Sequence, residues 1–138
     1  MNNATIGITI GIGVSFLFLY TRKTKWMKPK IVWAITIGLF LIGMFEILFT
    51  KPELKADRIL YLGLCIPLTY WTFDRIFKRI SENIHSRDFI LFLRGSGEVN
   101  ERIGAKNPHV KISDKLFTFG LVIIIIGTLL IGIQVGLK

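Results

Sequence analysis

The C-terminal stretch of this chain, residues 116–137, most constrains what the chain can form. It reads LFTFGLVIIIIGTLLIGIQVGL and contains no ionisable side chain. A helix of about 20 apolar residues is long enough to cross the hydrocarbon core of a membrane, which is about 30 Å thick. Residues 116–137 are therefore predicted to form a transmembrane helix.

Three other apolar blocks precede this stretch and are also predicted to span the membrane. The four predicted spans are residues 4–20, 31–50, 59–73 and 116–137. No Lys or Arg precedes the first block and several follow it, which is the reverse of a cleavable signal peptide. The expected fold class is therefore an all-α polytopic membrane protein. Its four transmembrane helices form a bundle, and the whole chain forms a single membrane domain.

The third block differs from the others because a proline and an early charge interrupt it. Pro67 removes a backbone donor and is expected to kink the helix near Gly63. From Asp74 onward, apolar residues recur three and four positions apart. This spacing predicts that the helix continues as an amphipathic segment to about residue 84, which either extends into the cytosol or bends at the membrane interface and lies along it. A cytosolic segment, residues 85–114, then leads to the last span.

The distribution of cations predicts the orientation of the spans. Of the 18 Lys and Arg residues, fourteen fall in residues 21–30 and 74–115, and four fall elsewhere. Cytoplasmic loops carry an excess of Lys and Arg, so these two segments are assigned to the inside and both chain ends to the outside. The predicted location is the bacterial cytoplasmic (inner) membrane, with several passes. Orientation then explains the net charge of +9 without a nucleic-acid partner.

The ionisable and nucleophilic residues form no recognisable catalytic or metal-binding pattern. Cys65 is the only cysteine, so neither an intrachain disulfide nor a cysteine metal site is expected. His85 and His109 have no acids or cysteines at ligand spacing, and Ser96 stands in no nucleophile motif. We therefore expect no catalytic residue, no cofactor and no metal, and we predict a protein that is not an enzyme.

Glu46 is the only ionisable residue inside a predicted span, and three interpretations of it stay open. A carboxylate in the membrane is costly and is a functional hypothesis by default, which favours handling of an ion or a substrate. Because Glu46 lies four residues from Thr50, it can also reach the interface and pair with a cation there. The third interpretation is contact with a partner. The candidate intramembrane site comprises Glu46, Tyr61, Thr69 and Tyr70.

Small residues four positions apart give three of the spans a face on which another helix can pack closely. These pairs are Gly7 and Gly11, Ala34 and Gly38, and Gly132 and Gly136. The faces serve either packing within the bundle or docking of a partner subunit, and a second copy of the chain is one such partner.

The cytosolic segment carries a mixed group of charged and apolar residues that is a candidate interaction patch. Its members are Asp88, Phe89, Phe92, Arg94 and Glu98. The apolar run at residues 89–93 is too short for periodicity to distinguish a strand from a helical turn or an interfacial dip. At the end of the segment, Ser113 or Asp114 is the expected N-cap of the last helix.

In size and number of spans, the chain is similar to small multidrug resistance transporters. In size and placement, it is similar to four-helix immunity proteins that protect bacteria from membrane-acting toxins. The transporters carry an acid in the middle of their first helix and residues 4–20 contain none, so no family is assigned. Beyond the lipid bilayer, the expected partner is a protein, bound by an immunity-type protector or by an accessory subunit of a membrane complex. The alternative is a small transporter or channel subunit that uses Glu46 and polar residues of the third span.

Overall fold

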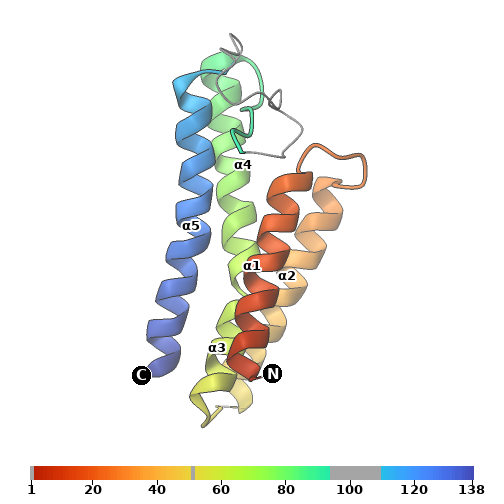
Figure 1. The fold of residues 1–138 in the computed structure, drawn as a ribbon. Helices are drawn as coiled ribbons and strands as arrows, with labels where there is room; N and C mark the ends of the chain where they lie inside the picture. The colour runs from red at the N-terminus through yellow and green to blue at the C-terminus, as the bar shows by residue number, and fades with distance from the viewer. Residues whose placement is uncertain (1, 51, 94–109) are drawn as a thin grey trace. The chain divides into compact units, whose positions relative to one another are not determined.

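The computed structural model describes residues 2–50, 52–93 and 110–138. Within these residues the chain is helical and forms no strand (Figure 1). The elements in chain order are α1 (Asn3–Thr21), α2 (Pro29–Phe45), a π-helical turn η1 (Glu46–Thr50), α3 (Lys55–Gly63), α4 (Ile66–His85) and α5 (Ile112–Leu137). The all-helical fold class is confirmed.

Three helices in the described part of the chain are long and apolar enough to cross a membrane. They are α1 with 19 residues, α2 together with η1 with 22 residues, and α5 with 26 residues. At about 1.5 Å per residue, each is close to or longer than the roughly 30 Å of a hydrocarbon core. These helices correspond to the first, second and fourth predicted spans.

The third predicted span consists of two helices. The chain is interrupted at Leu64 and Cys65, between the nine residues of α3 and the 20 residues of α4. Pro67 is the second residue of α4, where a backbone N–H would have no partner within the helix. The interruption lies beside Gly63, where the sequence predicts a kink. It ends one helix and begins another, so no continuous helix bends there.

The chain divides into two compact units. Unit 1 consists of Met1–Trp71 together with Ile124–Lys138, and unit 2 consists of Thr72–Ile123. Unit 1 therefore contains α1, α2, η1, α3, the beginning of α4 and the end of α5. Unit 2 contains the rest of α4, the beginning of α5 and the described part of the segment that joins them.

In unit 1, α1 and α3 pack with their backbones in direct contact. A Cβ atom on Gly63 would overlap the carbonyl of Gly7, and a Cβ atom on Gly11 would lie 2.5 Å from the oxygen of Gly63. On α2, a Cβ atom on Gly43 would lie 2.5 Å from the oxygen of Tyr61. Glycine at these positions lets the helices approach closely, which is how helices gain packing energy in lipid.

Both ends of the chain lie beside the start of α3 in unit 1 (Figure 1). Near the first end, Asn3 Nδ2 donates a hydrogen bond to Asp57 Oδ1 at 2.6 Å. Near the second end, a Cβ atom on Gly136 would lie 2.6 Å from Ile59 Cγ1. The two ends are therefore at the same end of unit 1.

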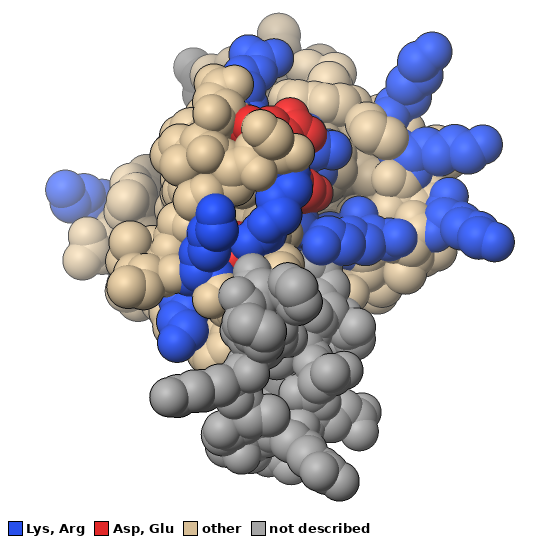
Figure 2. Space-filling view, turned by 90° about the horizontal axis from the view of Figure 1, so that it is seen from above, with Lys and Arg blue, Asp and Glu red and all other residues tan. Residues whose placement is uncertain are grey.

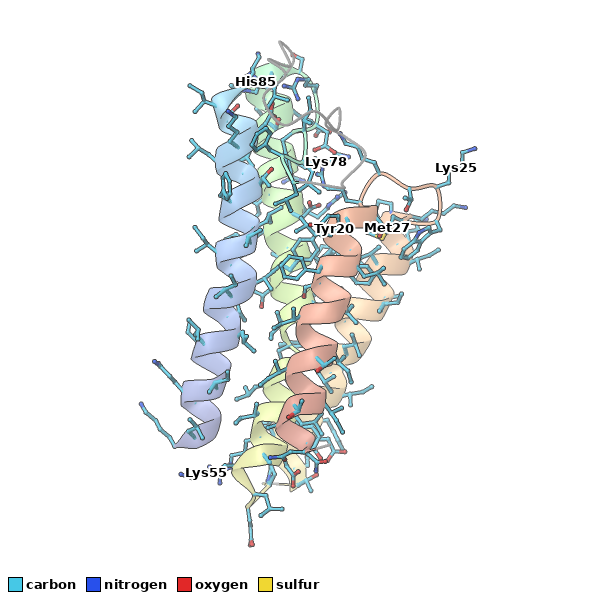
Figure 3. The ribbon with its side chains drawn as sticks, in the orientation of Figure 1. Tyr20, Lys25, Met27, Lys55, Lys78 and His85 are labelled. Carbon is cyan, nitrogen blue, oxygen red and sulfur yellow. The ribbon has the colours of Figure 1, made fainter. Side chains whose placement is uncertain are left out.

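The basic loop between α1 and α2, residues 22–28, lies at the other end of unit 1. Lys25 and Met27 of this loop are far from Lys55 at the start of α3 (Figure 3). Figure 2 is the view from the side on which this loop lies. Lys and Arg side chains occupy much more of the visible surface than Asp and Glu side chains do. The inward orientation of this basic end stays a prediction from the charge distribution.

Unit 2 pairs the second part of α4 with the first part of α5 in antiparallel orientation (Figure 1). Phe77 of α4 stacks on Phe117 of α5 with ring centroids 5.3 Å apart. Phe89, whose side chain is fully buried, packs edge-on against Phe117 at 5.6 Å. A Cβ atom on Gly120 would lie 3.1 Å from the Phe77 ring. These aromatic residues join the two helices to the segment between them.

Candidate functional site

Asp114 in unit 2 is fully buried and accepts several hydrogen bonds. Its Oδ2 accepts hydrogen bonds from Arg87 Nη2 and from the backbone N–H of Lys111, both at 2.8 Å. Its Oδ1 accepts from the backbone N–H of Ile90 at 3.1 Å and from Arg87 Nη1 at 3.3 Å. One carboxylate therefore links the first turn of α5 to Arg87 and Ile90, which follow α4, and to Lys111, which precedes α5.

The beginning of α5 differs from the sequence expectation. The helix begins at Ile112, so neither Ser113 nor Asp114 is its N-cap. Asp114 instead occupies the third helical position and reaches back to the N–H of Lys111, as the acidic member of a capping box does. A carboxylate in the first turn also interacts favourably with the helix dipole.

The environment of Asp114 shifts its ionisation. This residue precedes the charge-free stretch 116–137 and lies outside that predicted span. Burial alone opposes ionisation of the carboxyl group. The hydrogen bonds from Arg87, Lys111 and Ile90, with the charge of Arg87, nevertheless lower the pKa of Asp114 below its ordinary value of 3.8. Asp114 is therefore ionised at neutral pH and acts as an anionic clamp.

The apolar run at residues 89–93 forms neither helix nor strand, and it lies along the first turns of α5. Thr118, one turn after Asp114, accepts a hydrogen bond from the N–H of Phe92 at 2.9 Å and donates one to the Asp114 carbonyl at 2.8 Å. Phe89 and Leu91 are fully buried, with the two-residue alternation of a strand. Asp114 and Thr118 thus accept the hydrogen bonds of the Ile90 and Phe92 amides, as carbonyl groups of a neighbouring strand would.

The predicted interaction patch is only partly within the described residues, because Arg94 and Glu98 lie outside them. Phe89 is fully buried inside unit 2, so it stabilises the segment and offers no contact surface. Asp88 and Phe92 are partly exposed, and the ammonium group of Lys115 lies 4.8 Å from the centre of the Phe92 ring. The sequence pattern could not separate these roles, because burial of Phe89 depends on α5.

His85 joins the end of α4 to the start of α5. Its Nε2 lies 2.7 Å from Ser113 Oγ and its Nδ1 lies 2.9 Å from Lys111 Nζ. An ammonium group can only donate, so Nδ1 accepts from Lys111 and the ring proton of a neutral His85 is on Nε2. His85 therefore donates to Ser113. This arrangement positions the helix start and does not deprotonate the serine.

The predicted intramembrane site centres on Glu46, which begins the π-helical turn η1. Thr50 Oγ1 donates a hydrogen bond to Glu46 Oε2 at 2.7 Å. Glu46 also borders a hollow of about 510 Å³ that is otherwise apolar, and the lining residues are Leu41, Ile42, Met44, Phe45, Glu46, Leu48 and Phe49. No proline or glycine lies within η1, so the sequence carries no signal for this turn, although such turns often occur at functional sites.

The other members of that predicted site lie on α3 and α4. Thr69 Oγ1 donates to the Cys65 carbonyl at 3.4 Å, and Tyr70 is fully buried. Tyr61 is partly exposed, and its carbonyl meets Gly43 of α2. The hydrogen bonds of Glu46 and Thr69 described above each join residues four positions apart in the chain, so they do not link the two halves of the predicted site.

The three predicted small-residue faces have different environments in unit 1. Gly7 and Gly11 pack against α3, and Gly136 packs against Ile59. A Cβ atom on Gly132 would lie 3.5 Å from Leu62 Cβ, which is an ordinary van der Waals contact. Ala34 and Gly38 are different: Ala34 is exposed, and no atom lies within 4 Å of a Cβ atom on Gly38. Packing within the bundle thus accounts for two faces and leaves the α2 face open.

Comparisons with other proteins add no assignment. No protein-family model, curated protein or solved structure matches this chain. Within the described residues, no group of three or more His, Cys, Asp or Glu side chains could hold a metal ion. The function must therefore be argued from the surfaces of the two units.

Proposed function

We propose that this chain is a non-enzymatic protein of the bacterial inner membrane that binds a membrane-embedded protein partner along α2. The partner is either a membrane-acting toxin, which makes the chain an immunity-type protector, or the main subunit of a complex to which the chain is accessory. The observation that supports the proposal is an uncovered stripe of small and large apolar residues on α2.

The stripe follows the spacing of helix–helix contacts, with members four, three, four and four positions apart. Its members are Ala34, Gly38, Leu41 and Phe45 of α2, followed by Phe49 of η1. Leu41, Phe45 and Phe49 are 59%, 56% and 73% exposed. A partner helix can approach the α2 backbone at the small residues and contact the large side chains one and two turns further on.

Lipid chains can cover such a stripe as well, so its composition is what favours a protein. Small residues let two helix backbones approach closely, and helix association in lipid depends on that approach. Gly7 and Gly11 of α1 are already used in this way against α3. The corresponding pair on α2 is uncovered within the described residues, so a further helix is the natural occupant.

Glu46 borders the same stripe, because it lines the hollow together with Leu41, Phe45 and Phe49. A carboxylate can accept about four hydrogen bonds. A partner that places a cation or a hydroxyl group at this depth would offset the cost of keeping the carboxylate in the membrane. A second copy packed in parallel along the same face would bring two carboxylates together. A different protein therefore fits this surface better.

Photo-crosslinking tests the proposal in native membranes. A photoreactive side chain at Ala34 should crosslink to one protein and give a single complex of higher molecular mass. Gly38→Leu should remove this complex, because the added side chain blocks close approach of the partner helix to α2. The matched control is Gly13→Leu, since Gly13 on α1 also has no atom within 4 Å of a built Cβ atom. Adducts to lipid alone, or equal effects of the two leucine variants, would overturn the proposal.

The second candidate function is a small transporter or channel subunit, and the hollow beside Glu46 is the observation that favours it. Glu46→Gln keeps an oxygen that can accept from Thr50 and removes the charge. In reconstituted vesicles this variant should abolish flux if Glu46 binds an ion or a cationic substrate. Unchanged flux would exclude the transporter function.

A further inference from the structure

In unit 2, α4 exposes apolar side chains that a domain in water would bury, and it buries two polar ones. On α4, Asp74 and Ser81 are fully buried, whereas Ile76, Ile80 and Ile84 are 44%, 38% and 62% exposed. In an aqueous domain the isoleucines would be inside and the polar side chains outside. The sequence defines these two faces of α4 correctly, but it does not show that the apolar face points away from the protein.

The first turns of α5 repeat the same reversal. Asp114 and Thr118 are fully buried, and four apolar side chains are exposed on the other side. These exposed residues are Ile112, Leu116, Phe119 and Ile123. Apolar residues on the outside and hydrogen-bonded polar groups on the inside are what a lipid environment favours. Both helices of unit 2 therefore present a surface suited to lipid.

The charges of unit 2 indicate which part of the membrane this surface meets. The two buried acids have arginine partners: Asp74 pairs with Arg75 at 2.5 Å and Asp114 with Arg87 at 2.8 Å. Lys78 forms a longer pair with Glu82, at 3.7 Å (Lys78 and His85 are labelled in Figure 3). Two further cations, Arg79 and Lys115, are exposed among the isoleucines and leucine described above. Cations next to exposed apolar side chains match the boundary between anionic headgroups and acyl chains.

The register between the two helices gives the depth of each of these cations. His85 meets Ser113, so these residues are level in the antiparallel pair. Arg79 is six residues back along α4 and Phe119 is six residues on along α5, which is about 9 Å in each case. A span of about 20 residues that ends at Leu137 begins near Thr118. Arg79 therefore lies at the edge of the hydrocarbon core, and Lys115 lies roughly 6 Å further toward the headgroups.

We propose that unit 2 is an interfacial lipid-binding surface, in which Arg79 and Lys115 bind the phosphate groups of anionic phospholipids while Ile76, Ile80 and Phe119 contact the upper acyl chains. The proposal requires membrane residence but no protein partner, so it can fail or hold independently of the α2 docking surface. It also assigns residues 74–85 of α4 to the membrane interface, which is one of the two positions that the sequence left open for this segment.

Lipid retention by the purified full-length chain tests the role of the two cations. The probe is phosphatidylglycerol in mixed nanodiscs with phosphatidylcholine, and bound lipid is counted by native mass spectrometry after detergent release. Each exposed cation near a membrane surface contributes about a fivefold preference for anionic lipid. We expect Arg79→Gln with Lys115→Gln to reduce phosphatidylglycerol retention by about 25-fold relative to phosphatidylcholine.

The matched control is the double variant Lys55→Gln with Lys138→Gln, which removes two charges elsewhere. This variant should retain phosphatidylglycerol as the wild type does. Equal retention by all three proteins, or equal loss in both variants, would overturn the assignment of the phosphate site to Arg79 and Lys115.

Spin labels test the apolar part of the surface. In a Cys65→Ser background, labels at Ile76→Cys and Phe119→Cys should collide with oxygen much more than with a water-soluble nickel chelate. A label at Lys25→Cys in the α1–α2 loop should show the opposite preference. Preferential access of the chelate to positions 76 and 119 would place unit 2 in water, and shielding from both reagents would show that protein covers it. Either result would overturn the proposal.

Discussion

Gly7 of α1 and Gly63 of α3 meet backbone to backbone, and a side chain on Gly63 would overlap the carbonyl of Gly7. No flexible side chain lies between them that could move aside. The contact therefore requires glycine at position 63, and it fixes how closely the first helix can approach the third.

Gly63→Ala should lower the free energy of unfolding by about 1–3 kcal/mol, since overpacking of a tight contact costs that much. Equilibrium unfolding in mixed detergent micelles measures the change. Gly13→Ala is the control, because nothing lies within 4 Å of a Cβ atom at that position. In a helix, that control should gain up to about 1 kcal/mol from the higher helix propensity of alanine. A stabilised Gly63→Ala variant would contradict the contact.

Asp114→Asn should loosen the connection between α4 and α5. The amide loses the charge-assisted pair with Arg87 and two of its acceptor positions, at a cost of about 1–3 kcal/mol. Limited proteolysis should then cleave within residues 86–93 faster than in the wild type. Glu82→Gln is the control, since its pair with Lys78 is exposed and 3.7 Å long, and it should cleave at the wild-type rate.

The same carboxylate predicts a pH dependence. Hydrogen bonds and Arg87 lower the pKa of Asp114 in the folded state below the ordinary value of 3.8. The stabilisation is therefore complete above the unfolded-state pKa and is lost as the pH falls through the folded-state pKa. In a non-ionic detergent, the stability difference between the wild type and Asp114→Asn should be constant near neutral pH and should shrink below about pH 4. A difference independent of pH would show that Asp114 is not the titrating group.

Thr118→Val should expose the amide of Phe92 to exchange. Valine has nearly the shape of threonine but cannot accept the 2.9 Å hydrogen bond from that amide. Hydrogen exchange at Phe92, measured by NMR or by mass spectrometry of a short fragment, should become about fivefold faster for a lost bond of about 1 kcal/mol. Thr118→Ser restores the hydroxyl group and should restore protection. Equally fast exchange in the serine and valine variants would show that the hydroxyl group of Thr118 is not what protects the amide of Phe92.

Hydropathy and proline chemistry predict the fold well where they describe local properties. The apolar blocks became α1, α2 with η1, and α5, and the interruption beside Pro67 lies next to Gly63. Each of these features depends on residues within a few turns of one another, so a single sequence contains the necessary information.

Features that depend on contacts between distant segments could not be predicted from the sequence in this way. Gly43 and Gly63 pack closely against helices far along the chain, and neither belongs to a pair spaced four apart that was predicted as a packing face. Phe89 was expected on a surface and is buried, because Thr118 and Asp114 bind its neighbours from the next helix. The periodicity of α4 separates two faces, but only the tertiary contacts show that Asp74 and Ser81 are on the inside.

Asn3 and Gly136 reach residues of α3 that are only two positions apart, Asp57 and Ile59. A short linker could therefore join the ends of the chain, and new ends could be opened in the loop at residues 22–28. Such a circular permutant would keep the helix contacts of unit 1 while moving its free ends to the opposite end of that unit. Reporter tags on the native and the permuted chain would then label opposite faces of the membrane with the helix packing preserved.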